Sequence, residues 1–266
     1  MPAVVATESA PLTRSRLARP GAGTPPVNGE MWRAAPSYSR GSTTVALFRP
    51  ALLLAAWIVV SAVFAGCMAP FEKGITSRDE LKGKPRDSTG LGLLQPDDTW
   101  CSLLPEFEKC EHLQISPLRD SSGRFSEVAI SDASMEQVAR MPSLAYIHVE
   151  YTTSITTKGW SSLAKSPKLE TISIGPCKHL TDADIEELAN TPNLRDIYID
   201  DCLAVSDAGI RRLAHAPQLK CIILSKLPLL TSDGLSWLDS RSPPVLLQIR
   251  DCPNVPNKRV WVGKDK

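Results

Sequence analysis

The sequence predicts an α/β solenoid in which short helices cover one side of a sheet of parallel strands. Two observations support this fold class. Five units of 25 residues follow one another without a gap from Ile130 to Asn254, and each unit has an apolar pattern of helical period followed by strict alternation. A single unit of this kind cannot bury its own apolar side, so the units must stack on one another.

Apolar residues recur at fixed places in the 25-residue unit. The sixth residue of the successive units is Met135, Trp160, Ile185, Ile210 and Leu235. The eighteenth is Ile147, Ile172, Ile197, Ile222 and Leu247. The fifteenth is leucine in four units, but Pro244 takes its place in the last one, where the pattern weakens. Agreement at these places across five units predicts a structural repeat of 25 residues.

The first half of each unit predicts a short helix. It opens with a hydroxyl side chain suited to accept from the free N–H groups of a first helical turn, and these residues are Ser131, Thr156, Thr181, Ser206 and Thr231. In four units the helix is expected to stop before a proline, because proline disfavours helix in the residue that precedes it. These prolines are Pro142, Pro167, Pro192 and Pro217.

The second half of each unit predicts a strand. In "NLRDIYI" the apolar residues Leu194, Ile197 and Ile199 point inward, and Asp196 and Tyr198 point outward. Stacking of identical units then places the strands in parallel on the concave face and the helices on the convex face.

These residues resemble the cysteine-containing type of leucine-rich repeat, L-x-x-L-x-L-x-x-C-x-x-L-T-D. The pattern is matched by Leu194, Ile197, Ile199, Cys202, Val205, Ser206 and Asp207. "SDAGIRRL" and "TSDGLSWL" are similar to repeats of exported, planctomycete-type bacterial proteins. The resemblance implies a short right-handed leucine-rich-repeat solenoid that binds another protein without catalysis. It also implies that the thiols of Cys177, Cys202 and Cys252 are buried against backbone groups of the turns.

The N-terminal part predicts attachment to a membrane. Residues 1–49 contain six Arg and two acids and are expected to be a basic, disordered n-region. Residues 50–67 are an uncharged signal or transmembrane segment. Phe64-Ala65-Gly66-Cys67 resembles a bacterial lipobox, which implies cleavage before Cys67, its lipidation, and a membrane-anchored body on the extracytoplasmic side. An uncleaved anchor and an organellar transit peptide remain alternatives, and Met31 is an alternative start of translation to Met1.

The remaining boundaries follow from composition. Residues 68–98 are predicted to be a flexible tether because Gly, Pro and mixed charges dominate there. Residues 99–129 are expected to form an N-terminal cap, with a first strand within Cys110–Leu118 and a polar insertion after it. The repeats occupy 130–254, and residues 255–266 form a polar C-terminal cover. In an exported cap, Cys101 and Cys110 could form a disulfide.

The chain offers no pattern typical of catalysis, metal binding or nucleic-acid binding. From residue 50 onward, 24 basic and 27 acidic residues make the body mildly acidic, whereas phosphate binding needs a concentrated basic face. Cys110-Glu-His112 and Cys177-Lys-His179 each stand alone and are interpreted as turn residues. No nucleophile elbow, P-loop or H-E-x-x-H occurs. We therefore expect no enzyme activity, cofactor or metal.

The outward strand positions form the best candidate for a binding site. Tyrosine beside carboxylates is typical of contact surfaces, and the predicted patch comprises Tyr146, His148, Glu150, Asp196, Tyr198 and Asp200. Its carboxylates favour a basic protein partner. Ordinary solvated strand residues are the alternative interpretation of the patch. As a whole, the chain is predicted to be a membrane-tethered protein-interaction domain, with an organellar membrane-complex assembly factor or a ubiquitin-ligase substrate-receptor module as alternatives.

Overall fold

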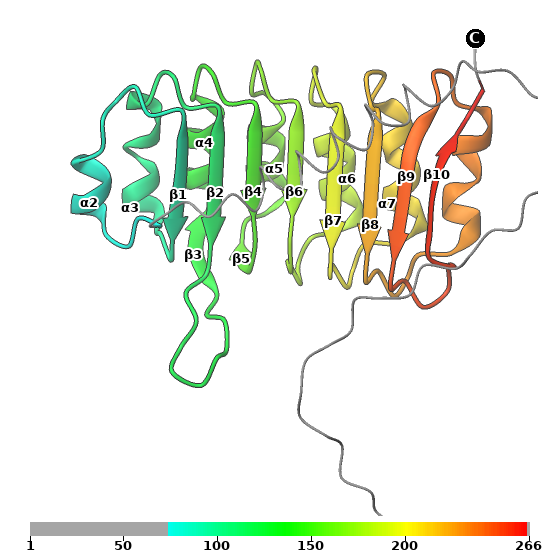
Figure 1. Ribbon diagram of the computed structural model, residues 1–266, viewed down its shortest axis with the longest axis horizontal. Coiled ribbons are helices and arrows are strands. Elements are labelled where there is room, and N and C mark those ends of the chain that lie inside the picture. The colour runs from blue at the N-terminus through cyan, green and yellow to red at the C-terminus, as the bar shows by residue number, and fades with distance from the viewer. Residues whose placement is uncertain (1–73, 265–266) are drawn as a thin grey trace, which may run out of the picture. The chain divides into compact units, whose positions relative to one another are not determined.

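The structure, a computed structural model, describes residues 74–264. Their main sheet has eight strands that follow one another in chain order, and all neighbours are parallel except the last pair (Figure 1). The strands are β1 Gly90–Leu94, β2 His112–Ser116, β4 Tyr146–Val149, β6 Thr171–Ile174, β7 Asp196–Asp200, β8 Cys221–Ser225, β9 Val245–Arg250 and β10 Lys258–Val262. A separate two-stranded sheet pairs β3 Val128–Ser131 with β5 Thr152–Ser154.

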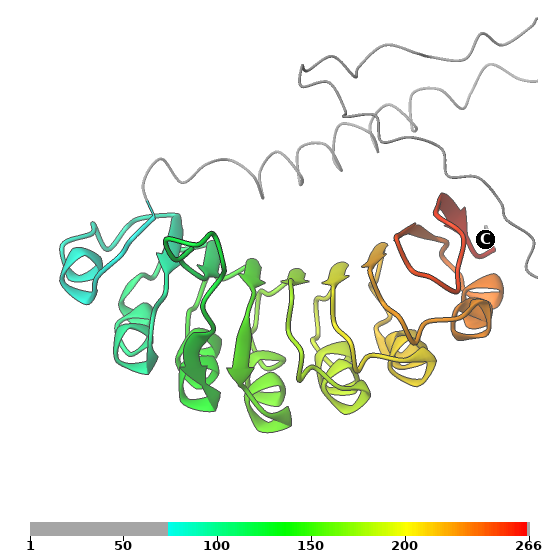
Figure 2. The ribbon, with the colours of Figure 1, turned by 90° about the horizontal axis from the view of Figure 1, so that it is seen from below.

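One helical segment follows most strands and returns the chain to the next. The α-helices are α2 Arg78–Lys82, α3 Asp98–Cys101, α4 Asp132–Ala139, α5 Thr157–Leu163, α6 Asp182–Ala189 and α7 Asp207–Arg212. The 3-10 helices are η1 Leu104–Glu106, η2 Leu213–His215 and η3 Ser232–Ser240. Figure 2 shows the strands on the concave side of a curved array and the helices on its convex side, as the sequence predicts.

The predicted strand register is confirmed from β4 to β9. Each strand residue there pairs with the residue 25 positions later. The eighteenth residues of the units therefore form one row across the sheet, and every member of this row is fully buried between sheet and helices: Ile147, Ile172, Ile197, Ile222 and Leu247. The core is a stack of such rows, because the same apolar residue type returns at the same place in each unit.

Carboxylates tie the start of one helix to the start of the next. Asp132 accepts from the backbone N–H and the hydroxyl of Thr156, both at 2.7 Å. Asp182 does the same for Ser206, at 2.8 and 2.6 Å. An Asp in the first turn thus satisfies groups at the cap of the neighbouring helix, which one helix alone leaves unpaired.

The cysteines of the repeat lie where the family resemblance implied, in the turns after the strands. The Cys202 thiol donates to the Asp200 carbonyl at 3.3 Å. Cys177 lies 3.3 Å from the Thr152 hydroxyl, and the Leu227 N–H donates to the Cys252 sulfur at 3.5 Å. Thr152 and Leu227 are the two places where the repeat lacks its cysteine, so each contacts a cysteine of the following unit.

The interpretation of residues 68–98 as a flexible tether is wrong for residues 74–98. These residues contain helix α2, with Leu81 fully buried, and strand β1, which pairs with β2. The array therefore begins before the predicted cap. Strand β1 does not follow the 25-residue repeat. Paired residues are 22 positions apart between β1 and β2 and 34 positions apart between β2 and β4.

The disulfide that Cys101 and Cys110 could form is not present in the structure, where both thiols are free and buried. The Cys110 thiol donates instead to the His112 carbonyl at 3.3 Å. Burial raises the pKa of Cys101 to about 12 and that of Cys110 to about 11. Both residues serve as small apolar side chains of the core.

The predicted polar insertion is a loop that projects from the edge of the array between β2 and β3 (Figure 1). An Asp120 turn closes it, with the Ser122 and Arg124 N–H groups donating to the carboxylate at 2.8 and 2.9 Å. The n-region, the signal or transmembrane segment and Cys67 lie outside the described residues. Within residues 74–264, no helix combines the length and the apolar character needed to cross a membrane.

Candidate functional site

The concave face carries a groove of about 580 Å³. Residues of strands β2 to β9 and of the turns that follow them line it, and five of the six predicted contact residues are among them: Tyr146, His148, Glu150, Tyr198 and Asp200. Strand pairing explains why they gather here, because outward residues of neighbouring parallel strands stand in rows about 5 Å apart.

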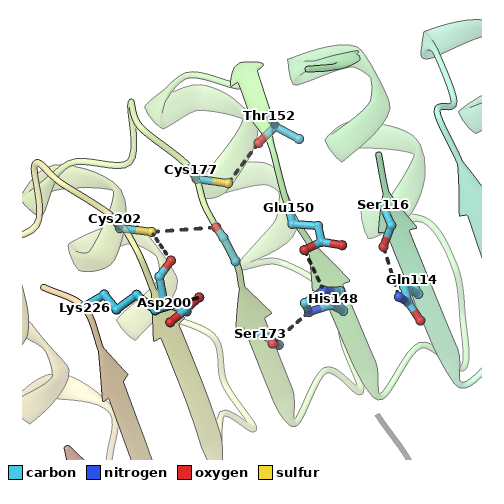
Figure 3. Close-up of polar contacts among 11 residues, drawn as sticks. Gln114, Ser116, His148, Glu150, Thr152, Ser173, Cys177, Asp200, Cys202 and Lys226 are labelled. Carbon is cyan, nitrogen blue, oxygen red and sulfur yellow. Dashed lines mark hydrogen bonds and ion pairs between the residues drawn. The ribbon is translucent and has the colours of Figure 1, made fainter. Parts of the chain in front are cut away.

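His148 links two strands at the floor of the groove. Its Nδ1 lies 2.9 Å from the Ser173 hydroxyl of β6, which is its register partner. Its Nε2 lies 3.8 Å from Glu150 Oε2 on the other side (Figure 3). Both side chains are only about one-fifth exposed, at 22% and 23%. The imidazole is therefore held in one orientation by a hydroxyl and a carboxylate.

Glu150 is an anion at neutral pH despite its burial. Burial raises the pKa of its carboxyl. The hydrogen bond and charge of His148 and the hydroxyl of Ser116 together lower it by more, so the pKa lies below its ordinary value. Gly175 makes room for this arrangement. A Cβ at Gly175 would lie 2.9 Å from Glu150 Cβ and 3.3 Å from Glu150 Oε2. The groove therefore depends on a residue without a side chain at Gly175, directly after β6.

A second carboxylate lies along the same row. Asp200 occupies the end of β7, and Lys226 of the next turn lies 3.5 Å from its Oδ2 (Figure 3). Both side chains remain more than one-third exposed, at 38% and 54%. An exposed pair of this kind is worth little energy, so Asp200 can exchange Lys226 for another cation at small cost.

Asp196, the sixth predicted residue, does not line the groove. It lies at the start of β7 and accepts from the Thr171 hydroxyl at 3.3 Å. Burial raises the pKa of its carboxyl, and the Thr171 hydrogen bond and the charges of Arg195 and Lys220 only partly offset this. The structure thus separates Asp196 from the other five residues.

Sequence reasoning missed some residues of the groove. Gln114 of β2 pairs with His148 and contributes to the wall through a side chain that donates to Ser116 at 3.0 Å. Its place in the alternation of "HLQIS" was the available signal. Among the residues that the structure describes, no group of three His, Cys, Asp or Glu side chains is arranged to hold a metal ion. Chemically, the groove presents carboxylates, hydroxyls and aromatic rings to a ligand, with the cations Lys226 and Arg250 at its C-terminal side.

Stacked strand–turn–helix units with buried aliphatic rows define a leucine-rich-repeat fold. Among solved structures, the chain is similar to internalin C2 of Listeria monocytogenes, with 21% identity, a TM-score of 0.43 and coverage of 67% of this chain and 78% of that chain. It is also similar to an internalin (inlF) of the same organism, with 15% identity, a TM-score of 0.30 and coverage of 69% and 66%. No family model and no curated protein matches the chain.

Proposed function

We propose that this chain is a membrane-tethered, non-catalytic leucine-rich-repeat protein of the cysteine-containing type, whose concave groove binds a basic segment of another protein. The observation that supports this proposal most is the gathering of Tyr146, His148, Glu150, Tyr198 and Asp200 in one groove. Aromatic rings supply contact area, and carboxylates favour a partner of opposite charge and speed its approach.

A basic partner follows from the ionisation of the groove. Glu150 carries its charge in a half-buried place because His148 and Ser116 lower its pKa. A lysine or arginine side chain that enters the groove would meet this carboxylate with little water between them, where a charge-assisted hydrogen bond is strong. Asp200 would offer a second contact on the same row.

The partner is tested by crosslinking in native membranes followed by capture of the full chain. Replacement of both acids, Glu150→Gln with Asp200→Asn, keeps the shape and removes the charge. Loss of a charge contact to the largely buried Glu150 costs about 2 kcal/mol or more, so the yield of the captured partner should fall at least about tenfold. Glu108→Gln with Glu187→Gln, two acids outside the groove, is the matched control. Equal yields from both double variants would exclude the groove as the binding surface.

Tethering is proposed from the sequence, because an uncharged run ends in Phe64-Ala65-Gly66-Cys67 after a basic flank. We expect cleavage before Cys67, acylation of its thiol, and a body on the extracytoplasmic side. Metabolic labelling with a fatty-acid probe should be lost in Cys67→Ala. An intact mass that retains residues 50–66 would replace the lipoprotein with an uncleaved anchor.

A further inference from the structure

The edge strands at the two ends of the main sheet differ in whether another segment of the chain pairs with them. At the first end, the chain before β1 covers the edge: the Ile75 N–H donates to the Gly92 carbonyl, and the Leu94 N–H donates to the Ile75 carbonyl, both at 2.8 Å. At the other end, β10 is the last strand of the sheet within residues 74–264. Alternate peptide groups of an end strand point away from its neighbour and are available for pairing.

Strand β10 also exposes apolar side chains at this edge. Val260 is 42% exposed and Trp261 is 47% exposed. Val260 pairs with Leu247 of the buried row, and Trp261 pairs with Leu246 of the concave face. Val260 therefore extends the row that is fully buried elsewhere in the sheet, and Trp261 extends a row of the concave face. The outer face of a terminal repeat is normally polar, and an exposed apolar edge strand is a template for another strand.

We propose that β10 pairs in antiparallel fashion with β10 of a second copy of this chain, around a two-fold axis at Val260. Each Val260 then lies opposite the other, and the core-facing row continues from one sheet into its partner. Arg259 lies opposite Trp261 of the second copy, and Lys258 lies opposite Val262. A two-fold interface of this kind is closed and uses the same surface of both copies.

The charges of the strand select this register. A shift of one pair in one direction places Arg259 opposite Arg259, and a shift in the other direction places Lys258 opposite Lys264. Like charges directly opposite each other destabilise a strand pair. In the proposed register, each cation lies opposite an apolar residue, where its stem can pack against that residue.

Cysteine crosslinking of the full chain in detergent tests the register. Directly opposite residues in antiparallel strands have Cα atoms about 4.5 to 5.5 Å apart, which suits a disulfide. Val260→Cys should therefore give a covalent dimer under mild oxidation, measured against the wild type. Lys258→Cys and Val262→Cys should each stay monomeric alone but form a disulfide when mixed. Equal crosslinking of all single variants, or none with Val260→Cys, would overturn the proposal.

Sedimentation equilibrium tests the association without a crosslink. Val260→Lys puts two ammonium groups opposite each other and should raise the dimer dissociation constant at least about tenfold. Leu229→Lys, at an equally exposed leucine (51%), should leave it unchanged. Residues 206–264 contain 9 basic and 4 acidic residues, so the two ends repel and added salt should tighten the dimer. A dimer that salt weakens, or that Val260→Lys leaves intact, would contradict the interface.

Discussion

The Asp184 carboxylate accepts from the backbone N–H and the hydroxyl of Thr181 in its own unit, at 2.7 and 2.8 Å. It also accepts from the Thr157 hydroxyl of the preceding unit at 2.7 Å. In neighbouring units the acid belongs to the preceding helix, as with Asp132 and Thr156. Thr157 is the residue 25 positions after Asp132, and it carries no charge. Asp184, at the start of the following helix, therefore supplies the carboxylate at the contact between these two units.

This difference between units predicts that substitutions at Thr157 and Asp184 compensate for each other. Thr157→Asp alone brings a second carboxylate against Asp184, and Asp184→Gly alone leaves the Thr181 cap unsatisfied. Each should lower the free energy of unfolding by about 1–3 kcal/mol. In the neighbouring units the acid faces a glycine of the next helix, as Asp132 faces Gly159 and Asp182 faces Gly209. The double variant recreates this arrangement and should recover most of the loss. Denaturant unfolding of all four proteins gives the coupling energy, and simple additivity would contradict this compensation.

The same junctions require glycine. At Gly209 a Cβ would clash with the Asp182 carboxylate and lie 3.0 Å from Asp182 Cα. Because backbone cannot yield cheaply, Gly209→Ala should destabilise the fold by about 1–3 kcal/mol. Gly83→Ala is the control, since its Cβ would meet only ordinary contacts at 3.5 Å or more. That variant should be neutral or up to about 1 kcal/mol more stable, as measured by thermal unfolding.

Neighbouring residues of β7 should respond oppositely to substitution. Ile197 is fully buried, whereas Tyr198 lies half-buried on the concave face. Ile197→Asp would bury an unpaired charge and abolish cooperative unfolding. Tyr198→Ala should change the free energy of unfolding by less than about 1 kcal/mol. Similar melting curves for the two variants would contradict the strand orientation.

The Glu150 carboxyl predicts an acid-side contribution to stability. Because its pKa is lowered in the folded chain, the stabilisation is complete above the ordinary value of 4.5 and disappears as pH falls through the folded pKa. His148→Ala removes a hydrogen bond and a charge that lower this pKa, so the pKa should rise. NMR titration of the Glu150 carboxyl measures it, with His179→Ala as control. An unchanged pKa in His148→Ala would show that the 3.8 Å contact has no electrostatic effect.

The Asp196 carboxylate should lower the stability of the fold at neutral pH, whereas the Glu150 carboxylate should raise it. Burial raises the pKa of its carboxyl, so the ionised form costs stability above the ordinary value of 3.8 and the cost vanishes as pH falls below it. Asp196→Asn keeps an oxygen for the Thr171 hydroxyl and removes the charge. The variant should gain stability at neutral pH, by less than about 1 kcal/mol. A loss of stability at pH 7 in denaturant unfolding would show that the charge itself is needed.

Strict periodicity determined how much of the fold could be predicted. Where the spacing is 25 residues, apolar positions alone specify which strand residues pair, as in the row through Ile172 and Ile197. Strand β2 was predicted within Cys110–Leu118, but β1 escaped because its residues pair with residues 22 positions later and "GLGLL" offers only three leucines, Leu91, Leu93 and Leu94, beside two glycines. Strand β10 escaped because it turns antiparallel, which no property of the repeat requires.

The candidate site was predictable in its members but not in its shape. Outward alternation assigned Tyr146, His148 and Tyr198 to one face, because successive strand side chains point to opposite sides. Which acid enters the groove depends on its place along the strand: Glu150 lies above Gly175, whereas Asp196 lies at the strand start beside Thr171. Sequence alternation treats both acids alike, and only the three-dimensional packing distinguishes them.

The buried thiols have a consequence for how the fold responds to reducing agents. All six cysteines between residues 74 and 264 are free and buried, and burial raises the pKa of each of these thiols, Cys177 and Cys252 among them. A protonated, inaccessible thiol neither attacks a disulfide nor oxidises readily. The folded array of residues 74–264 therefore holds together without a disulfide, and a reducing agent should leave its native state unchanged.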